Sequence, residues 1–233
     1  MMTDVTFLLS SRDYRPQSEN VLRVGAIQTY SSVAGPGIRA VIWVTGCNRR
    51  CPGCIKPEYL SFDVGKMIAI EELAEIILNC QSISGVTFSG GEPFEQPLPL
   101  ANLSRILKVN GLSVLAYSGY RLDALEADRP RFGCLLERLD WLIDGEFRQE
   151  HMGPLQYKGS ANQRLLKRCD DGSFVEVSTD RIHDVQISLD QNQVRLTGFP
   201  NREFQKSFSE SLERQGLILK PIDNDLNLHD ETT

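Results

Sequence analysis

Cys47-Asn48-Arg49-Arg50-Cys51-Pro52-Gly53-Cys54 is the stretch that decides how this chain folds and what chemistry it supports. Three thiolates so close together can bind one small inorganic group, but they cannot all pair as disulfides. Iron–sulfur clusters are held by such thiolates, usually four, so three leave one iron of a four-iron cluster without a protein ligand. An open coordination position is where a metal site carries out chemistry. Structural zinc with a fourth, histidine ligand stays an alternative, although the nearest histidine, His151, lies far along the chain.

A second motif, Ser89-Gly90-Gly91-Glu92-Pro93, follows a run of apolar and β-branched residues. This pattern predicts a strand that ends in a tight corner free of side chains. Glycines at such a corner let backbone carbonyls and amides approach a ligand closely. A carbonyl edge beside a carboxylate suits a cation such as an ammonium group, whereas the phosphate-binding G-x-x-x-x-G-K-[ST] pattern does not occur in the sequence.

Composition limits the classes of protein to which the chain can belong. Its 233 residues suffice for one sizeable core, and 41% hydrophobic and 24% charged residues are typical of a globular protein. A net charge of −6 argues against nucleic acid and membrane partners, since both attract a basic surface. Because we see neither a signal peptide nor a membrane-spanning run, we expect a cytoplasmic protein. Cys80, Cys134 and Cys169 are isolated in the sequence, so we expect them to be core or incidental thiols and expect no second cluster.

Hydrophobic periodicity and turn residues predict four parts. These are an N-terminal arm (1–20), an α/β domain (21–170), a C-terminal strand and helix extension (171–220) and a disordered tail (221–233). Within the α/β domain we expect strands at 21–30, 38–45, 86–89, 112–118 and 141–143, and helices at 69–79, 98–109, 122–127 and 131–138. Alternation of strands and helices predicts a parallel sheet.

The C-terminal extension has a different pattern. It predicts strands at 174–177, 185–189 and 194–196, with a hairpin connection at 190–193. Phe204, Phe208 and Leu212 then fall on one face of a helix. We expect the hairpin and helix to cover the open edge of the sheet, where an unpaired strand would be exposed; a lid or a docking module for a partner are the alternatives.

Three predicted strand ends converge on one place. Cys47, Gly90 and Ser118 each follow directly on a predicted strand. Sites in parallel sheets gather beyond the carboxyl ends of the strands, so the cysteines and the glycine corner are expected to meet there.

Together these motifs resemble the radical S-adenosylmethionine (SAM) superfamily, and within it the activating enzymes of anaerobic ribonucleotide reductase. The likeness covers about Ile27 to Leu166, and five segments carry it: Gly35–Arg39 with the strand after it, Gly46–Cys54, Ser89–Pro93, Tyr117–Tyr120, and Leu142–Phe147 followed by Lys158–Arg164. The sequence departs from the simplest activases by continuing some way past Arg164, which leaves the substrate open.

The resemblance implies a partial (βα) barrel that holds one 4Fe–4S cluster through Cys47, Cys51 and Cys54. It implies that the backbone of Gly90-Gly91-Glu92 holds the SAM amino group, that Ser118 lies near the ribose or carboxylate, and that a 5′-deoxyadenosyl radical takes hydrogen from a polypeptide. Candidates for lining the substrate side are Tyr120, Asp144, Lys158, Ser160, Asn162 and Gln163.

Ordinary structural roles remain the alternative for these candidates, for example a helix N-cap for Asn162 and a surface charge for Lys158. The implied partners are a glycyl radical enzyme, or a precursor peptide in a peptide-modifying relative, and an electron donor such as flavodoxin or ferredoxin. A small-molecule radical enzyme and a non-catalytic iron–sulfur or zinc protein are further alternatives, and the last has no need of a Gly-Gly-Glu corner.

Overall fold

The computed structural model describes residues 19–153, 155–178, 185–190, 193–199 and 202–216 of the chain. The predicted arm, tail and hairpin turn fall largely outside these residues. The main body is one eight-stranded sheet in the order β3-β1-β2-β4-β5-β6-β7-β8. Its strands are β1 (Val21–Ser31), β2 (Arg39–Val44), β3 (Lys66–Ala69), β4 (Gly85–Gly90), β5 (Ser113–Ser118), β6 (Trp141–Asp144), β7 (Arg164–Arg168) and β8 (Phe174–Glu176).

The centre of the sheet is parallel and its flanks are antiparallel. Strands β2, β4, β5 and β6 pair in chain order with parallel registers, as the alternating pattern predicts. On one side β1 pairs antiparallel with both β2 and β3, and on the other β7 pairs antiparallel with β6 and β8. The expectation of a purely parallel sheet was therefore wrong at its flanks, and the sheet of the described residues is open, not closed on itself.

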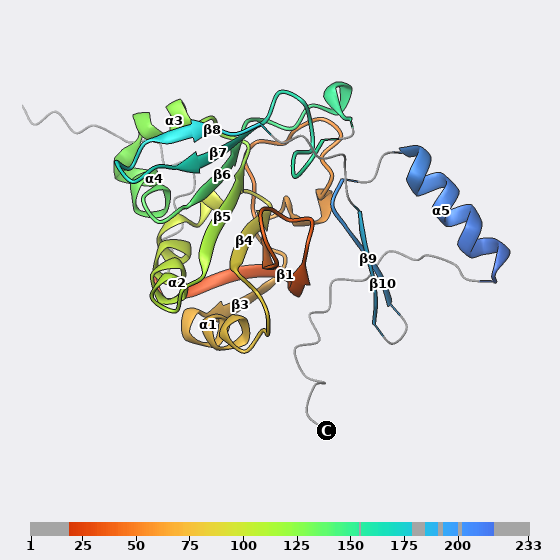
Figure 1. The fold of residues 1–233 in the computed structure, drawn as a ribbon, viewed down its shortest axis with the longest axis horizontal. Helices are drawn as coiled ribbons and strands as arrows, with labels where there is room; N and C mark the ends of the chain where they lie inside the picture. Colours follow the sequence, from red (N-terminus) through yellow and green to blue (C-terminus); the bar gives the residue numbers. More distant parts are fainter. Residues whose placement is uncertain (1–18, 154, 179–184, 191–192, 200–201, 217–233) are drawn as a thin grey trace, which may run out of the picture.

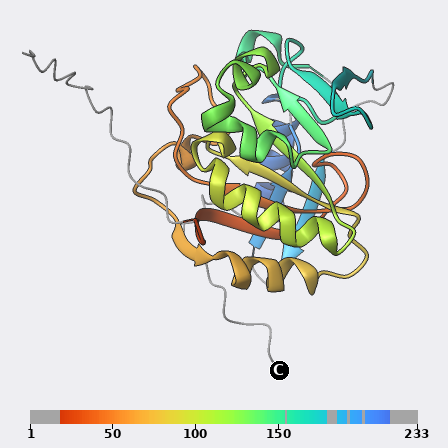
Figure 2. The same ribbon diagram turned by 90° about the vertical axis from the view of Figure 1, so that its left-hand side faces the viewer.

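Four helices connect the parallel strands and cover one face of the sheet. They are α1 (Ile70–Leu78), α2 (Pro97–Val109), α3 (Leu122–Ala127) and α4 (Arg129–Leu136), with short 3₁₀ turns at Pro57–Tyr59, Pro93–Glu95 and Gln149–His151. Right-handed crossovers between neighbouring parallel strands place all their helices on the same side. Figure 2 shows these helices in front of the sheet, with the C-terminal strands behind it.

Alternation along β2 shows how the sequence builds two layers. Ala40, Ile42 and Val44 belong to the main core under the helices, whereas Val41 and Trp43 belong to a smaller cluster on the opposite face. Both faces of this strand are buried, which explains its continuous apolar run. The cysteine and glycine motifs border this opposite face.

Helix boundaries follow the expected local chemistry. Buried Ile70, Leu73, Ala74 and Ile77 recur at helical spacing along α1. After α2, Gly111 adopts φ +82° and donates its N–H to the carbonyl of Lys108, which is the glycine cap that the sequence predicts. No helix among the described residues has the length and apolar character needed to cross a membrane.

The C-terminal extension forms β9 (Gln186–Asp190), β10 (Gln193–Thr197) and α5 (Arg202–Arg214). β9 and β10 pair with each other as a separate two-stranded sheet, not with edge strands β3 or β8. Figure 1 shows them on the side of the sheet away from α1–α4. The expected position at the open edge was therefore wrong. Two strands, β3 and β7, were absent from the sequence prediction; both are short and flanked by charged residues.

Candidate iron–sulfur site

The predicted motifs meet at one cavity on the face of the sheet opposite the helices. Its lining includes all three motif cysteines, Ser89 to Glu92, and Ser118 with Gly119. Cys47 lies just beyond the end of β2, Gly90 ends β4, and Ser118 ends β5. The convergence expected at the carboxyl ends of the parallel strands is confirmed.

Backbone hydrogen bonds hold the start of the cysteine loop, at Gly46 and Cys47, whereas Cys51 and Cys54 are more exposed. The N–H groups of Gly46 and Cys47 donate to the carbonyls of Tyr59 and Leu60 at 2.9 and 3.1 Å. Cys47 is buried, and burial raises the pKa of its thiol to about 11. Cys51 and Cys54 are half-buried, and burial also raises the pKa of the Cys51 thiol. A bound cation is what would stabilise these thiols as thiolates.

The donor set fits an iron–sulfur cluster. Among the described residues, no group of three or more His, Cys, Asp or Glu side chains is placed to hold a single metal ion. The three soft thiol ligands border one space, and no histidine lines it with them. Cys47, Cys51 and Cys54 are the residues that would hold the cluster, and the zinc alternative gains no fourth ligand here.

The glycine corner lies directly against the base of the cysteine loop. Gly91 donates its N–H to the Val44 carbonyl at 2.7 Å, and Glu92 donates to the Gly46 carbonyl at 2.9 Å. A Cβ on Gly91 would lie 2.4 Å from the Gly46 oxygen, and one on Gly90, where φ is +103°, would lie 2.3 Å from the Val44 oxygen. Both positions therefore require glycine, because backbone atoms occupy the space of a side chain.

The Glu92 carboxylate points into the protein and joins two strand ends. It is 1% exposed and accepts hydrogen bonds from Phe94 N–H (3.1 Å), Ser118 Oγ (3.0 Å) and Gly119 N–H (2.7 Å). Burial raises its pKa to about 7, against the lowering effect of these hydrogen bonds. Glu92 thus fixes the loop after β5 to the corner after β4.

The substrate-side candidates divide into two groups. Gln163 lines the cavity; its Oε1 accepts from the N–H groups of Gly159 (2.8 Å) and Ser160 (3.2 Å), and its Nε2 donates to the Gly145 carbonyl (2.9 Å). The other five candidates do not line the cavity themselves, but each is adjacent in sequence to a residue that does: Tyr120, Asp144, Lys158, Ser160 and Asn162.

Most of this second group hold neighbouring segments together. Tyr120 donates its hydroxyl proton to Glu95 at 2.7 Å. Asp144 is fully buried and accepts from Leu122 N–H at 2.7 Å and from the Arg164 guanidinium. Asn162 donates to the Glu146 carbonyl at 2.7 Å and precedes a strand, which rules out its alternative as a helix N-cap.

Ser160 is buried, and its Oγ accepts from Arg148 N–H at 3.1 Å. Lys158 is half-buried. Arg49 also lines the cavity; its guanidinium pairs with Glu146 at 3.8 Å and lies 5.0 Å from the centre of the Tyr120 ring.

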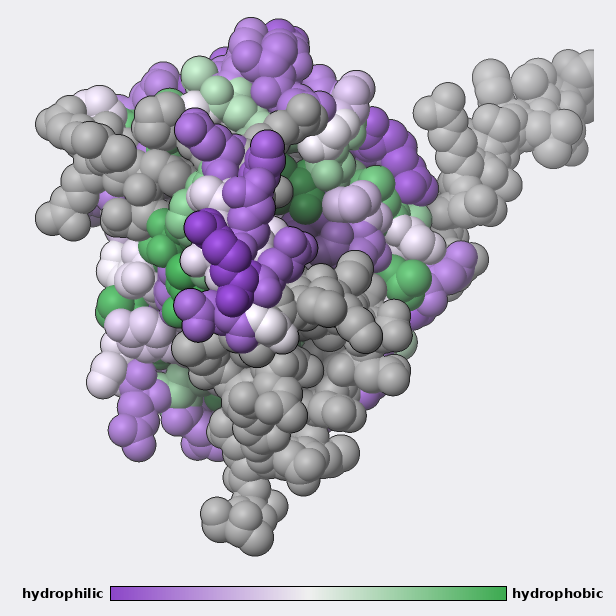
Figure 3. All heavy atoms as spheres, turned by 90° about the vertical axis from the view of Figure 1, so that its right-hand side faces the viewer, coloured by the Kyte–Doolittle hydropathy of each residue, from purple (hydrophilic) through white to green (hydrophobic). Residues whose placement is uncertain are grey.

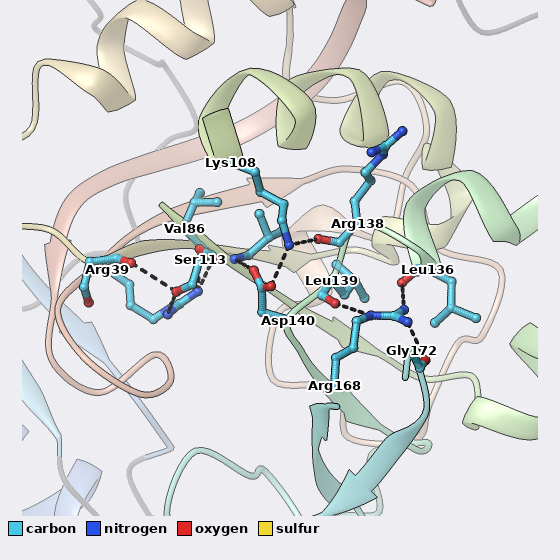
Figure 4. Close-up of polar contacts among 12 residues, drawn as sticks. Arg39, Val86, Lys108, Ser113, Leu136, Arg138, Leu139, Asp140, Arg168 and Gly172 are labelled. Atoms are coloured by element: carbon cyan, nitrogen blue, oxygen red, sulfur yellow. Dashed lines mark hydrogen bonds and ion pairs between the residues drawn. The ribbon is translucent and has the colours of Figure 1, made fainter. Parts of the chain in front are cut away.

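Arg39 is the positioning residue that sequence reasoning missed. Its side chain is fully buried and donates to Thr87 Oγ1 (2.7 Å), the Pro36 carbonyl (2.9 Å), the Val86 carbonyl (2.6 Å), and Ser113 O and Oγ (both 3.0 Å). Figure 4 shows this arginine at one end of a row of polar groups that continues through Asp140 to Arg168. Arg39 thereby ties the loop at residues 34–37, whose Ala34 lines the cavity, to β4 and β5. Arginine is rarely fully buried, so the sequence gives no local indication of this role.

Two further lining groups were also missed. Trp43 is 8% exposed on β2, and residues Leu196–Phe199 at the end of β10 come from a distant part of the chain. Two of the three isolated cysteines, Cys80 and Cys134, pack at the margin of the main core, and Cys80 donates its S–H to the Ile76 carbonyl at 3.3 Å.

An open α/β sheet that gathers three thiols and a glycine corner at its strand ends defines an iron–sulfur protein with a ligand cavity beside the metal site. Residues 33–166 match the family described as "4Fe-4S single cluster domain". The anaerobic ribonucleoside-triphosphate reductase-activating proteins of Salmonella typhi and Vibrio cholerae are 35% and 32% identical; the match covers 56% of this chain and 89% and 88% of theirs. The chain belongs to this single-cluster family.

The pyruvate formate-lyase-activating enzyme of Clostridium pasteurianum is 36% identical over 42% of this chain and 44% of its own length. Among solved structures, QueE from Escherichia coli has a TM-score of 0.33 at 18% identity, covering 42% of this chain and 52% of QueE. The resemblance expected from the motifs is confirmed, as is a 4Fe–4S cluster as cofactor.

Proposed function

We propose that this protein is a radical SAM enzyme that activates a partner enzyme of the anaerobic ribonucleotide reductase type by taking a hydrogen atom from a glycine Cα. The observation that carries the proposal is the union of the three cysteines with the Gly90–Glu92 corner in the lining of one cavity. When bound, the reduced cluster and SAM supply one-electron cleavage of the sulfonium S–C5′ bond, which yields methionine and a 5′-deoxyadenosyl radical.

The residues of the chain then have distinct tasks. Cys47, Cys51 and Cys54 hold the cluster, and the Gly90 and Gly91 backbone offers its polar edge to the amino group of SAM. Glu92 acts as a positioning residue, because its carboxylate holds Ser118 and Gly119 against that corner. The apolar residues around Trp43 shield the cavity from bulk solvent.

Several finer points belong to the same proposal. The in-order strands β2, β4, β5 and β6 are the part of a (βα) barrel that this chain retains, within an α/β domain at 21–170. We place the protein in the cytoplasm, with a flavodoxin or ferredoxin as electron donor and with neither nucleic acid nor membrane as partner. The names of the relatives support an enzyme as substrate, since each is described as activating another enzyme. Modification of a ribosomally made peptide is the second candidate, favoured by the extension that lies beyond the family match.

The first test is cofactor binding and SAM cleavage. The protein is reconstituted anaerobically with iron and sulfide, reduced, and incubated with SAM, and 5′-deoxyadenosine is quantified by chromatography. We expect one cluster per chain and slow release of 5′-deoxyadenosine. Cys51→Ala should lose the cluster, whereas Cys134→Ala, which removes an equally half-buried thiol, should keep it. A colourless zinc form without affinity for iron, or no 5′-deoxyadenosine even with the partner enzyme, would contradict the proposal.

The second test concerns the substrate. Partner enzyme deuterated at glycine Cα is mixed with the loaded protein and SAM, beside a panel of nucleotides and pterins. We expect deuterium in 5′-deoxyadenosine and a glycyl radical signal by electron paramagnetic resonance. Transfer from a small molecule alone would overturn the choice of a polypeptide substrate.

A further inference from the structure

The end of β10 supplies part of the wall of the candidate active site. Leu196, Thr197, Gly198 and Phe199 line the same cavity as the motif cysteines. They lie beyond residues 33–166, which the family match covers. The site of this chain is therefore completed by a segment outside the shared domain.

Polar contacts hold this segment against β1. Thr197 is 6% exposed and donates its hydroxyl proton to Oε1 of Gln28, at 2.8 Å. On β9, Gln186 Oε1 accepts from Ser32 N–H at 2.9 Å. Because Gln28 is itself buried on β1, the contact with Thr197 is between two desolvated groups and fixes the position of the strand end.

Phe199 packs against the ring of Tyr117 and lies close to Gly159. Its ring lies 6.0 Å from the ring of Tyr117 at an angle of 59°, a geometry that aromatic pairs favour. Tyr117 is held in turn by its hydroxyl, which donates to the Tyr157 carbonyl at 2.7 Å. A Cβ on Gly159 would lie 3.1 Å from both Phe147 and Phe199, so the absence of a side chain there leaves the ring its place.

The chemistry of the cavity differs from one part to another. The cationic lining residues, Arg49 and Lys56, belong to the cysteine loop or directly follow it. The part formed with the β10 end is apolar and aromatic, with Trp43, Tyr117 and Phe199. Figure 3 shows hydrophobic residues set in a recess of this face behind projecting hydrophilic ones. Lys56 reaches the Trp43 side of this part, with its Nζ 6.0 Å from the centre of the Trp43 ring. A charged side chain buried beside Tyr117 and Phe199 would lose its hydration.

We propose that Leu196–Phe199 is a specificity wall that admits a polypeptide segment with small, uncharged residues around the reacting position. The inference rests on the proposed function and names the substrate class of that same site. Phe199 and Tyr117 line the cavity side by side, and their aromatic surroundings disfavour a charged flanking residue. The wall selects a loop with glycine or alanine at its centre and apolar neighbours.

Binding of labelled peptides tests the wall separately from catalysis. Two fluorescein-labelled peptides share a central glycine; one has Ala and Val flanks and the other has Asp and Lys flanks. Affinity for the reconstituted protein is measured by fluorescence anisotropy. We expect the wild type to prefer the apolar peptide by about tenfold or more. Phe199→Ala should reduce this preference to about twofold, because it removes the ring that closes the wall.

Phe204→Ala is the matched control, since it removes the same side chain from α5, whose residues do not line the cavity. It should keep the wild-type preference. If Phe199→Ala loses its near-ultraviolet circular dichroism signal, Phe199→Leu is measured instead. Its preference for the apolar peptide should be at most half that of the wild type. An equal preference in the Phe199 variants and the wild type, or no preference in the wild type, would overturn the specificity wall.

Release of 5′-deoxyadenosine without substrate separates the two proposals. It is measured in the wild type and in the Phe204→Ala control, in which it should be the same because α5 does not line the cavity. A wild type that binds peptides selectively but cleaves no SAM would leave the wall standing and refute the proposed function. SAM cleavage without peptide preference would do the reverse.

Discussion

Replacing Gly91 by alanine tests the contact between the glycine corner and the cysteine loop. The new Cβ would lie 2.4 Å from the Gly46 oxygen and 2.8 Å from the Tyr59 oxygen, so the Gly46 carbonyl must retreat by about 1 Å to reach ordinary contact at 3.4 Å. That carbonyl accepts the Glu92 N–H, and Gly46 N–H donates to Tyr59. Overpacking of this kind costs about 1–3 kcal/mol, and weakening two backbone hydrogen bonds costs about 1 kcal/mol each. We expect the free energy of unfolding to fall by about 4 kcal/mol.

The same displacement reaches the metal site, because Gly46 immediately precedes Cys47. Gly91→Ala is therefore expected to impair both SAM binding and the cluster. The measurements are urea unfolding of the apoprotein, iron content after reconstitution, and the rate at which a chelator removes iron. We expect lower iron content and faster removal.

Gly111→Ala is the control for Gly91→Ala. Gly111 also has a positive φ, +82°, but a Cβ there would meet nothing within 4 Å. Its substitution should therefore cost only the backbone strain of a left-handed residue, about 1 kcal/mol, and should not affect iron. Unfolding of the two variants at the same urea concentration, with equal retention of iron, would refute the expected clash at Gly91.

Three further substitutions probe other parts of the site. Arg39→Lys keeps the charge but cannot reproduce five planar donor contacts, so urea unfolding should show a loss of about 3 kcal/mol; a loss below about 0.5 kcal/mol would contradict the positioning role. Burial raises the pKa of the Glu92 carboxyl from 4.5 to about 7, so the folded protein holds this proton more tightly than the unfolded chain does. The stabilisation that results is complete below pH 4.5, and it is lost as the pH rises through 7. Relative to Glu92→Gln, wild-type stability should thus fall by about 3 kcal/mol between pH 4.5 and pH 8, and parallel pH profiles of the two proteins would argue against a buried, proton-retaining carboxyl. Simultaneous replacement of Cys80, Cys134 and Cys169 by serine should leave the iron content unchanged. Loss of iron would show that a cluster ligand lies outside the cysteine motif.

Local sequence signals were sufficient for the elements that position the site. Helix α1, the glycine cap after α2 and the strand before the cysteines follow from periodicity and turn chemistry within short windows. The meeting of Cys47, Gly90 and Ser118 was also predictable, because parallel strands place their carboxyl ends at one edge of a sheet. Strand β7 was missed because its charged residues Arg164, Lys167 and Arg168 hide the two buried leucines between them.

Contacts between distant segments were beyond the sequence. Glu92 was expected to contribute beside a ligand through its backbone, and nothing local indicates that its carboxylate turns inward to Ser118 and Gly119. Arg39 likewise finds its acceptors on strands that lie far along the chain. Side-chain direction at such positions depends on which strands become neighbours, and a single sequence does not encode that in any short window.

The end of β10 is the long-range contact with the largest consequence for function. The sequence predicted that the extension covers the open edge of the sheet, with a lid or a docking module as alternatives. In the structure, Thr197 and Phe199 border the cavity that the cysteines border, so the extension belongs to the site itself. This segment lies outside residues 33–166, which the family match covers. Under the proposed function, the cysteines and the glycine corner serve the reaction, and the wall at Leu196–Phe199 is where selection for a different polypeptide would act.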